Sequence, residues 1–489
     1  MNRILIEVLD GKNCIGGSKI LITEKDRSFF LDFGKNFKTW GNYFEEYLQP
    51  RTSVGLYDLW KLNLIPKVSN IYRDDLIVSD FKEFVEKERK LNLKAIFLSH
   101  AHLDHAGFIS ILKDDTEIVT SSITKKILKA LQDTGDGRVF NQFTELKIRE
   151  EEIDEHGQKK LKQKKDRESI KRNFFEINNN EFEGEIDGLK FKTFYVDHSI
   201  PGALAFYFEF ENISIAYTGD IRFHGKNSED SYNFLEKVKK LKPNILITEG
   251  TRMNYESESK KESDVYKSSF EVINNNKDKL VIADFGPRNI ERLETFLKIV
   301  KETSRKIVIN IKDAYLLDLL KEDGFNIIDD DNLFIICEKK SKEKKCLNEV
   351  KNKYDEKLIT IEDINKNLGE FILCYSFWDL TNLLDIDLKD GIYIYSSSEA
   401  YSEEQEFDIK RLFNWLHYFN LEPFGIELTN DKPKFSGNFH SSGHASYKDI
   451  KFMIDEINPE FIIPVHTEKS EIFKNLYGNK VIEKEYFEL

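Results

Sequence analysis

Short apolar runs alternate with longer amphipathic stretches along most of the chain. Residues 94–98 and 461–464 are apolar runs with the length of single strands. Residues 289–301 and 447–457 instead space their apolar side chains three or four positions apart, as one face of a helix requires. Ser446 stands directly before the second of these stretches and is a good N-cap. The alternation predicts an α/β fold.

Two polar segments interrupt this pattern. Residues 147–173 carry a lysine-rich run, for which we expect a solvated helix or loop, with a nucleic-acid contact as the alternative. Residues 251–277 are rich in Glu, Ser, Lys and Asn and follow a strand-like run. We expect a linker there that leads into a helix, and hence a domain boundary.

Composition narrows the class of protein. A length of 489 residues suggests two or three domains. No apolar run reaches the roughly 18 residues of a membrane helix, and Glu7 and Asp10 interrupt the apolar start. We therefore expect neither a membrane association nor a secretory signal. Four scattered cysteines without a CxxC pair predict reduced thiols and a cytoplasmic location.

The formal net charge of −14 bears on nucleic-acid binding. An acidic chain does not attract polyanions through its overall charge. If nucleic acid is the substrate, the positive potential has to be local or supplied by metal ions.

The most specific motif is the sequence LSHAHLDHAG at residues 98–107, which follows a strand-like run. Imidazole nitrogen and carboxylate oxygen suit zinc and related divalent ions. His100 and His102 are two positions apart, so their rings can point the same way in extended chain. Asp104 and His105 follow where the chain turns. One loop can therefore serve two metals.

Further histidines and an aspartate occupy loops of the same kind. His198 and Asp220 follow strand-like runs, His440 and His444 lie in the segment HSSGHA, and His466 follows another strand-like run. Taken singly, a loop histidine is usually structural. Beside a two-metal loop that needs partners, we interpret these residues as parts of one site.

These residues resemble the metallo-β-lactamase superfamily, which implies an αββα sandwich with a dinuclear metal site. The resemblance covers five motifs in order, beginning with Asp32 in FLDFG. It implies that Asp32 is a buried acid, hydrogen-bonded to the site rather than a ligand. The implied ligands are His100, His102 and His198 for one metal, Asp104, His105 and His466 for the other, and Asp220 for both.

A second set of motifs resembles the β-CASP subgroup and, within it, the ribonuclease J type. The set comprises Glu249 in TEGT, His444 in SGHA, and His466. Histidine at the last motif is associated with RNA-processing members, whereas the Artemis-like DNA branch tends to carry valine. The implied organisation is a metallo-β-lactamase domain at 1–250 (with the insertion at 147–173), an inserted β-CASP α/β domain at 251–430, and a return to the first domain at 431–489.

The sequence departs from ribonuclease J in four places. Glu249 lies in Glu-Gly-Thr where many members have Asp-Ser-Thr, and His466 begins His-Thr-Glu instead of His-Gly-Glu. The 147–173 insertion is unlike the compact versions. The stretch after His466 is too short for the C-terminal domain of the bacterial enzymes, so the resemblance does not imply an oligomer built through that domain.

The resemblance implies a metal-dependent ribonuclease with 5′–3′ exonuclease activity, endonuclease activity or both. It implies two divalent ions, with Zn²⁺ expected and Mn²⁺ or Mg²⁺ left open. Such ions, about 3.5–4 Å apart, activate a hydroxide for in-line attack on phosphorus. We place Asp104 and Asp32 in the catalytic group as well. His444 is the candidate general acid, and Glu249 orients or charges it.

Candidate substrate contacts lie at two predicted helix starts. Ser441, Ser442 and Gly443 offer amides and hydroxyls to a terminal phosphate, and His440 assists them. Arg288 is a second candidate phosphate contact.

Three alternatives remain open at this point. A DNA nuclease of the Artemis type shares the metal ligands, but the histidine at the last motif argues against it. A small-molecule hydrolase, such as a lactonase or thioesterase, does not explain the long insertion. A non-catalytic subunit would normally have lost ligands. We expect RNA as the substrate and leave a homodimer open.

Overall fold

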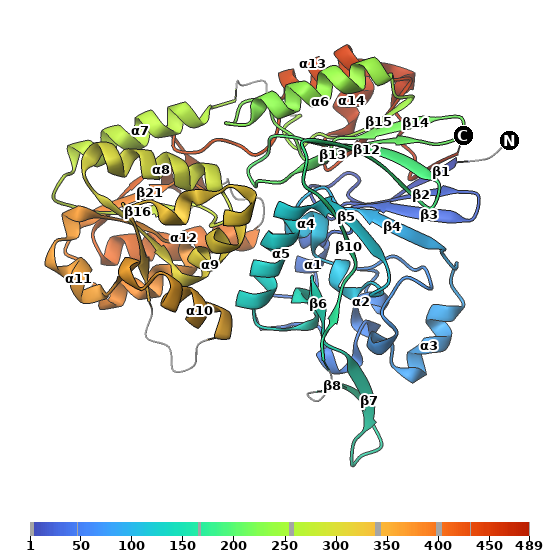
Figure 1. Cartoon of the computed structure of the whole chain (residues 1–489), viewed down its shortest axis with the longest axis horizontal. Helices are drawn as coiled ribbons and strands as arrows, with labels where there is room; N and C mark the ends of the chain where they lie inside the picture. The colour runs from blue at the N-terminus through green and yellow to red at the C-terminus, as the bar shows by residue number, and fades with distance from the viewer. Residues whose placement is uncertain are drawn as a thin grey trace.

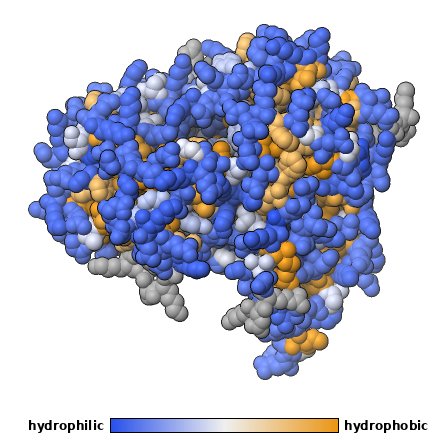
Figure 2. Space-filling view, viewed as in Figure 1, coloured by the Kyte–Doolittle hydropathy of each residue, from blue (hydrophilic) through white to orange (hydrophobic). Residues whose placement is uncertain are grey.

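The structure, a computed structural model, describes residues 4–45, 47–164, 168–253, 259–337, 344–397, 403–430 and 432–488, without the side chains of 403–407. Residues 165–167, in the lysine-rich run, lie outside these ranges. None of the helices within them combines the length and apolar character needed to cross a bilayer. Hydrophilic side chains dominate the face in Figure 2, and hydrophobic ones lie in small separate areas.

The first sheet has seven strands in the order β10-β5-β4-β3-β2-β1-β26. Its strands are β1 (Ile4–Asp10), β2 (Lys19–Glu24), β3 (Arg27–Leu31), β4 (Leu93–Phe97), β5 (Glu117–Ser121), β10 (Phe174–Ile177) and β26 (Tyr486–Glu488). β26 pairs antiparallel with β1, so both ends of the chain meet at one edge of this sheet (Figure 1).

The second sheet has six strands in the order β11-β12-β13-β14-β15-β25. They are β11 (Glu181–Ile186), β12 (Leu189–Tyr195), β13 (Leu204–Glu209), β14 (Ser214–Tyr217), β15 (Ile245–Glu249) and β25 (Phe461–Val465). β14, β15 and β25 are mutually parallel. β25 therefore returns from far along the chain to complete the sheet.

These two sheets pack face to face. Ile20 and Phe97 of the first sheet and Phe206 and Ile247 of the second are fully buried in one cluster between them. The outer face of the first sheet is covered by α2 (Tyr57–Lys61), α3 (Ser79–Glu86) and α5 (Ser122–Thr134). The outer face of the second is covered by α6 (Ser228–Leu241), α13 (Tyr447–Ile457) and α14 (Ser470–Tyr477). The predicted αββα sandwich is confirmed.

The third sheet consists of seven parallel strands in the order β19-β18-β17-β20-β16-β21-β22. They are β16 (Leu280–Asp284), β17 (Lys306–Asn310), β18 (Leu333–Ile336), β19 (Leu358–Ile359), β20 (Phe371–Cys374), β21 (Gly391–Tyr395) and β22 (Leu421–Phe424). The middle residues of its central strands are apolar, and apolar clusters cover both faces of the sheet. The domain limits at 250 and 430 stay a prediction.

Helices connect the strands of the third sheet and join it to the sandwich. They are α7 (Glu262–Asn275), α8 (Ile290–Thr303), α9 (Ile311–Leu320), α10 (Lys345–Lys353), α11 (Ile361–Lys366) and α12 (Glu403–Tyr418). α9 packs on α5 of the sandwich, where the Tyr315 hydroxyl donates to Asp133 over 2.6 Å. Figure 1 shows the third sheet and its helices beside the sandwich, with α5 on the facing side.

The lysine-rich segment forms a β-hairpin, so the expected helix or loop is wrong. β7 (Arg149–Ile153) and β8 (Lys159–Gln163) pair antiparallel and project from the sandwich (Figure 1). Cross-strand ion pairs explain this, because Lys162 lies 2.7 Å from Glu152 and Lys164 2.9 Å from Glu150. These lysines therefore offer phosphate less uncompensated charge than the sequence run suggested.

Smaller elements complete the fold. β6 (Glu145–Leu146) pairs with β9 (Ile170–Lys171) beside the hairpin, and β23 (Ile426–Thr429) pairs with β24 (Lys432–Phe435). Two short helices, α1 (Phe37–Gly41) and α4 (Leu103–Ala106), follow β3 and β4.

The buried side chain of Leu161 attaches the hairpin to the sandwich core. We expect Leu161→Ala to lower the free energy of unfolding by about 2–5 kcal/mol, because it leaves a cavity in packed apolar surroundings. Gln163→Ala, at an exposed position of the same strand, is the matched control and should change it by less than about 0.5 kcal/mol. Urea denaturation followed by circular dichroism measures both. Equal effects of the two substitutions would contradict the anchoring role.

Candidate metal centre

The ligand motifs meet at one edge of the sandwich because each follows the carboxyl end of a strand. His100 to His105 follow β4, Asp220 follows β14, and His466 follows β25. His198 lies in the loop between β12 and β13. The carboxyl ends of parallel strands share an edge, so residues distant in sequence converge there.

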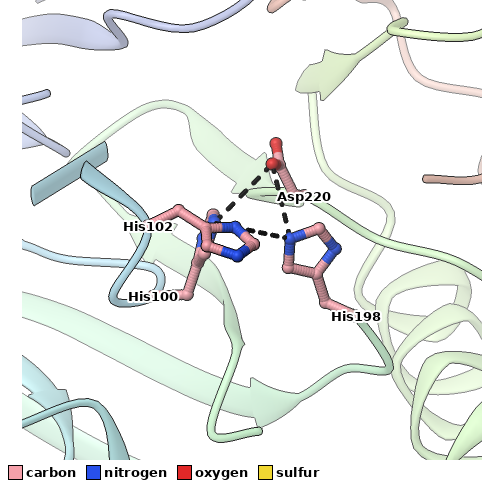
Figure 3. Close-up of side chains that lie close together, drawn as sticks. All are labelled: His100, His102, His198 and Asp220. Atoms are coloured by element: carbon pink, nitrogen blue, oxygen red, sulfur yellow. Dashed lines mark hydrogen bonds and ion pairs between the residues drawn. The ribbon is translucent and has the colours of Figure 1, made fainter. Parts of the chain in front are cut away.

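One group of four side chains comprises His100, His102, His198 and Asp220. The Nδ1 atom of His102 lies 3.1 Å from Nε2 of His100 and 3.1 Å from Nε2 of His198. Oδ2 of Asp220 lies 3.6 Å from the His100 nitrogen and 3.7 Å from the His198 nitrogen. Figure 3 shows the three rings turned toward one another and toward the carboxylate.

A second group comprises Asp104, His105 and His466. Oδ2 of Asp104 lies 3.0 Å from Nε2 of His466 and 3.7 Å from Nε2 of His105. Oδ2 of Asp220 is 3.3 Å from the His105 nitrogen and 3.9 Å from the His466 nitrogen. The two groups of the sequence prediction are thus brought together on either side of Asp220.

Hydrogen bonds from the far side of three rings leave a nitrogen lone pair facing the centre in the neutral rings. Nδ1 of His198 donates to the Gly443 carbonyl over 2.6 Å, and Nδ1 of His105 donates to Asp32 over 2.7 Å. Ser99 Oγ donates to Asp32 and accepts from Nδ1 of His100 over 2.9 Å. In the neutral form of each of these rings Nε2 therefore carries the lone pair, as a metal ligand requires.

The donor set fits a divalent cation. Burial lowers the pKa of His100 and His198 well below the usual value, and burial followed by the Arg288 charge lowers that of His102 to about 3. When the rings are neutral, at most one proton is available for the two 3.1 Å contacts of His102 with His100 and His198. In at least one of these contacts two nitrogen lone pairs therefore face each other. A cation satisfies them all, and metal ligands must be deprotonated.

Two buried atoms without hydrogen-bond partners in the described part of the chain also indicate that the centre binds a cation. His105 Nε2 and Asp220 Oδ1 are buried without a hydrogen-bond partner among the described residues. Although burial opposes it, the Asp220, Asp104 and Asp32 carboxylates raise the pKa of His105 well above its usual value. The site therefore concentrates negative charge that a bound cation compensates.

Asp32 is fully buried beneath the ligands and accepts four hydrogen bonds. They come from the backbone N–H and hydroxyl of Ser99, from Nδ1 of His105 and from the hydroxyl of Tyr217, over 2.6–2.8 Å. Its φ of 57° is unusual for a residue other than glycine, as is the φ of 50° at His466. Backbone strain of this kind persists only where the surrounding structure holds it.

The predicted acid pair lies directly beside the centre. Nδ1 of His444 is 2.9 Å from Oε2 of Glu249 and 3.8 Å from Oδ2 of Asp220. Burial lowers the pKa of His444, but Glu249 and Asp220 outweigh it and raise the pKa to about 9. Asp220, Glu249, His444 and His466 also form a third group close enough to hold a cation, which the sequence did not indicate.

The HSSGHA loop has a supporting role that the sequence did not reveal. Its Gly443 carbonyl holds His198, and a Cβ at Gly443 would come within 2.6 Å of Ser199 Oγ, so the close approach requires glycine. The Ser442 carbonyl contacts Nε2 of His224 over 3.0 Å, and the Ser441 hydroxyl donates to the Lys260 carbonyl over 2.8 Å.

The remaining candidate contacts lie on either side of this loop. Nδ1 of His440 lies 3.3 Å from the Ser396 carbonyl, and burial followed by Arg292 lowers its pKa to about 3. Arg288 follows β16, and its charge acts on His102 and Asp104. Their contacts with substrate, like those of Ser441 to Gly443, stay predictions.

Sequence reasoning missed Ser99, Tyr217 and Thr251 as orienting residues. The Thr251 hydroxyl donates to Glu249 over 2.7 Å and accepts from Nδ1 of His466 over 2.8 Å. The adjacent Glu249 motif was the available signal for Thr251, and the position next to His100 was the signal for Ser99.

We expect Thr251→Val to weaken metal binding by about 10–100-fold, the usual effect of losing a partner that orients a ligand. Thr251→Ser keeps the hydroxyl and should bind metal like the native protein. Competition with a chromogenic chelator measures the affinity, and circular dichroism checks the fold. Equal affinities in the two variants would show that the hydroxyl does not position His466.

Two family models match the chain. Residues 74–251 match the metallo-beta-lactamase superfamily, and residues 437–477 match the Zn-dependent metallo-hydrolase RNA specificity domain. The first match contains the His100 loop, His198 and Asp220, and the second contains His444 and His466. Both therefore include residues of the centre.

Known relatives and a solved structure extend the match. Ribonuclease J of Mycoplasma genitalium is 20% identical over 407 residues, 80% of this chain and 60% of that protein. Ribonuclease J of Pyrococcus abyssi is 22% identical over 396 residues, 78% and 75% of the two chains. The chain thus spans about three fifths of the length of the Mycoplasma relative. A protein of unknown function from Enterococcus faecalis V583 has a crystal structure with a TM-score of 0.73, at 21% identity and with 100% of both chains covered. The chain is a metallo-beta-lactamase-fold protein that resembles ribonuclease J.

Proposed function

We propose that the protein is a metal-dependent ribonuclease of the ribonuclease J type, which hydrolyses phosphodiester bonds of RNA as a 5′–3′ exonuclease, an endonuclease or both. The observation that carries the proposal is the position of Asp220 between two ligand groups, with the His444–Glu249 pair alongside. The names of the relatives and the RNA specificity match support RNA as the polymer.

Two divalent cations fit this arrangement. His100, His102 and His198 would hold one, Asp104, His105 and His466 the other, and Asp220 would face both. Nitrogen-rich ligand sets favour Zn²⁺ over Mg²⁺, and we propose zinc with Mn²⁺ as the alternative. Bound cations supply Lewis-acid chemistry that lowers the pKa of water and neutralises charge on the attacked phosphate.

The chain's own groups complete the reaction. His444 lies beside Asp220, where it would donate its proton to the ribose oxygen that leaves phosphorus. Glu249 accepts from Nδ1 of His444 and keeps the ring charged and oriented. Ser441, Ser442 and Gly443, with His440 and Arg288, would bind phosphates on either side of the cleaved bond. Asp32 holds His105 and, through Ser99, His100 in place.

The third sheet is proposed to be the inserted β-CASP domain of residues 251–430. It follows Glu249 and ends before the loop that carries His444. Such an arrangement places acid-pair residues at both junctions between the domains. A substrate strand held between the domains would then meet the metal groups and the acid pair together.

We expect His102→Ala and Asp220→Ala to abolish cleavage, because each removes a ligand while the sandwich core is untouched. The substrates are 5′-labelled RNA and DNA with monophosphate, triphosphate or hydroxyl ends, and circular dichroism checks the fold. The product ladder reports polymer, polarity and end preference. His417→Ala, away from the centre, is the matched control. Cleavage of DNA in preference to RNA would favour the Artemis-type alternative, and activity retained by both ligand variants after chelation would exclude the mechanism.

We expect His444→Ala to slow RNA cleavage by about 10²–10⁴-fold while bound metal is retained, as loss of a general acid does. A phosphodiester with a 4-nitrophenolate leaving group needs no proton, so its hydrolysis should fall far less. Rates on both substrates and metal content by mass spectrometry are the measurements. An equal loss on both substrates, or loss of metal, would show that His444 is a ligand instead.

A further inference from the structure

A cavity of about 620 Å³ lies beyond the metal centre, at the carboxyl edge of the third sheet. Asp284 at the end of β16 and Tyr395 at the end of β21 line its floor, and Asp313 at the start of α9 lines one side. Apolar residues of α5, among them Leu131, form the facing wall. Open parallel sheets bind ligands outside the carboxyl ends of their strands. The volume lies within the usual range for small-molecule sites.

The lining includes two carboxyl groups, those of Asp284 and Asp313. Asp284 is 4% exposed and accepts from the hydroxyls of Tyr393 over 2.5 Å and Ser397 over 3.2 Å. A carboxylate offers about four acceptor positions, so two are left for a ligand. Burial raises the pKa of Asp284 to about 6, and burial followed by Asp379 raises that of Asp313 to about 7. Partly protonated acids of this kind donate to hydroxyl groups as well as accept from them.

Arg288 connects the cavity with the metal centre. Its side chain lines the cavity, and its charge acts on His102 and Asp104 of the centre. Its Nη1 is buried without a hydrogen-bond partner among the described residues. A buried guanidinium nitrogen left unpaired is costly, which points to an anionic ligand that pairs with it. Lys312 lines the same cavity and adds a second cation.

An exposed aromatic ring stands in the lining. Trp378 is 76% exposed and packs edge-on against Phe377, with ring centroids 5.3 Å apart. An exposed indole at a binding site gives a face on which a base stacks. The third carboxylate of the lining, Asp408, is paired with Arg411 over 2.8 Å and so is not the primary hydroxyl acceptor.

We propose that this cavity binds one ribonucleotide unit, with its phosphate at Arg288, its ribose hydroxyls at Asp284 and Asp313, and its base on Trp378. The proposal rests on the ribonuclease function above, because the unit is part of the substrate strand or a free mononucleotide of the same chemistry. A 2′-hydroxyl is the group by which a protein tells RNA from DNA at one position. The cavity would thus add discrimination that the metal groups, which face only phosphate, do not provide.

Binding is tested first, without cleavage, by titrating the full chain with 5′-AMP and with 2′-deoxy-5′-AMP while tryptophan fluorescence is recorded. We expect saturable quenching by 5′-AMP and about tenfold weaker binding of the deoxy form, since one hydrogen bond to a buried acid is lost. Trp378→Phe should remove most of the signal. Asp313→Asn should bind both nucleotides alike. Asp390→Asn, an exposed carboxylate at the opposite edge of the same sheet, should behave like the native protein.

Whether the cavity holds a nucleotide of the substrate RNA is tested by cleavage of RNA oligomers with a single 2′-deoxy substitution at successive positions. We expect about tenfold slower cleavage for one position near the cut, and loss of that difference in Asp313→Asn. Asp284→Asn repeats the test from the other side of the cavity. If cleavage depends on the position of the 2′-deoxy substitution, the cavity binds a nucleotide of the substrate RNA. If 5′-AMP binds but cleavage shows no such dependence, the cavity binds a free mononucleotide.

Two further outcomes separate this proposal from the function itself. Equal affinity for the two nucleotides, together with no positional effect on an RNA that the native protein cleaves, would overturn the ribonucleotide site and leave the ribonuclease standing. Discrimination between the nucleotides by a protein that cleaves no RNA would retain the site and overturn the ribonuclease.

Discussion

The buried carboxylate of Asp220 is the constraint on which the rest of the centre depends. Five imidazole nitrogens, from four separate loops, lie 3.3–3.9 Å from its Oδ2 atom. A charge removed from water in this way is costly unless it is paired, so the loops have to converge on it. Histidines from both ends of the chain meet here, which obliges β25 to return and complete the second sheet.

The sandwich supplies the rigidity that this convergence needs. Asp32, at the end of β3, joins the ligand loop to Tyr217 of the other sheet through four hydrogen bonds. Thr251 connects Glu249 with His466, and Gly443 holds His198. Each support fixes which nitrogen of a ring faces the centre, so binding of a cation requires little rearrangement. The same supports tie the acid pair to the metal groups.

Buried ion pairs lie where the third sheet and its helices meet the sandwich. Arg222, two residues after Asp220, is buried and pairs with Asp197 and with Glu291 of α8. Arg292 of the same helix pairs with Glu262 of α7 over 2.6 Å. Buried pairs of this kind are strongly destabilising to break, because they leave an uncompensated charge. The cavity and the metal centre are therefore held in a defined relation.

The sequence by itself determined the α/β alternation and the set of residues able to bind metal, because short spacing and strand-end position are local properties. The residues from His100 to His105 form a recognisable metal-binding pattern within six positions. Only the tertiary structure decided what depends on pairing between distant segments. The lysine run became a hairpin because glutamates on the opposite strand neutralise it. Gly443 serves His198 through its carbonyl, which no side-chain pattern encodes. Arg288 lines a cavity together with residues far apart in the chain, and only their packing brings them together.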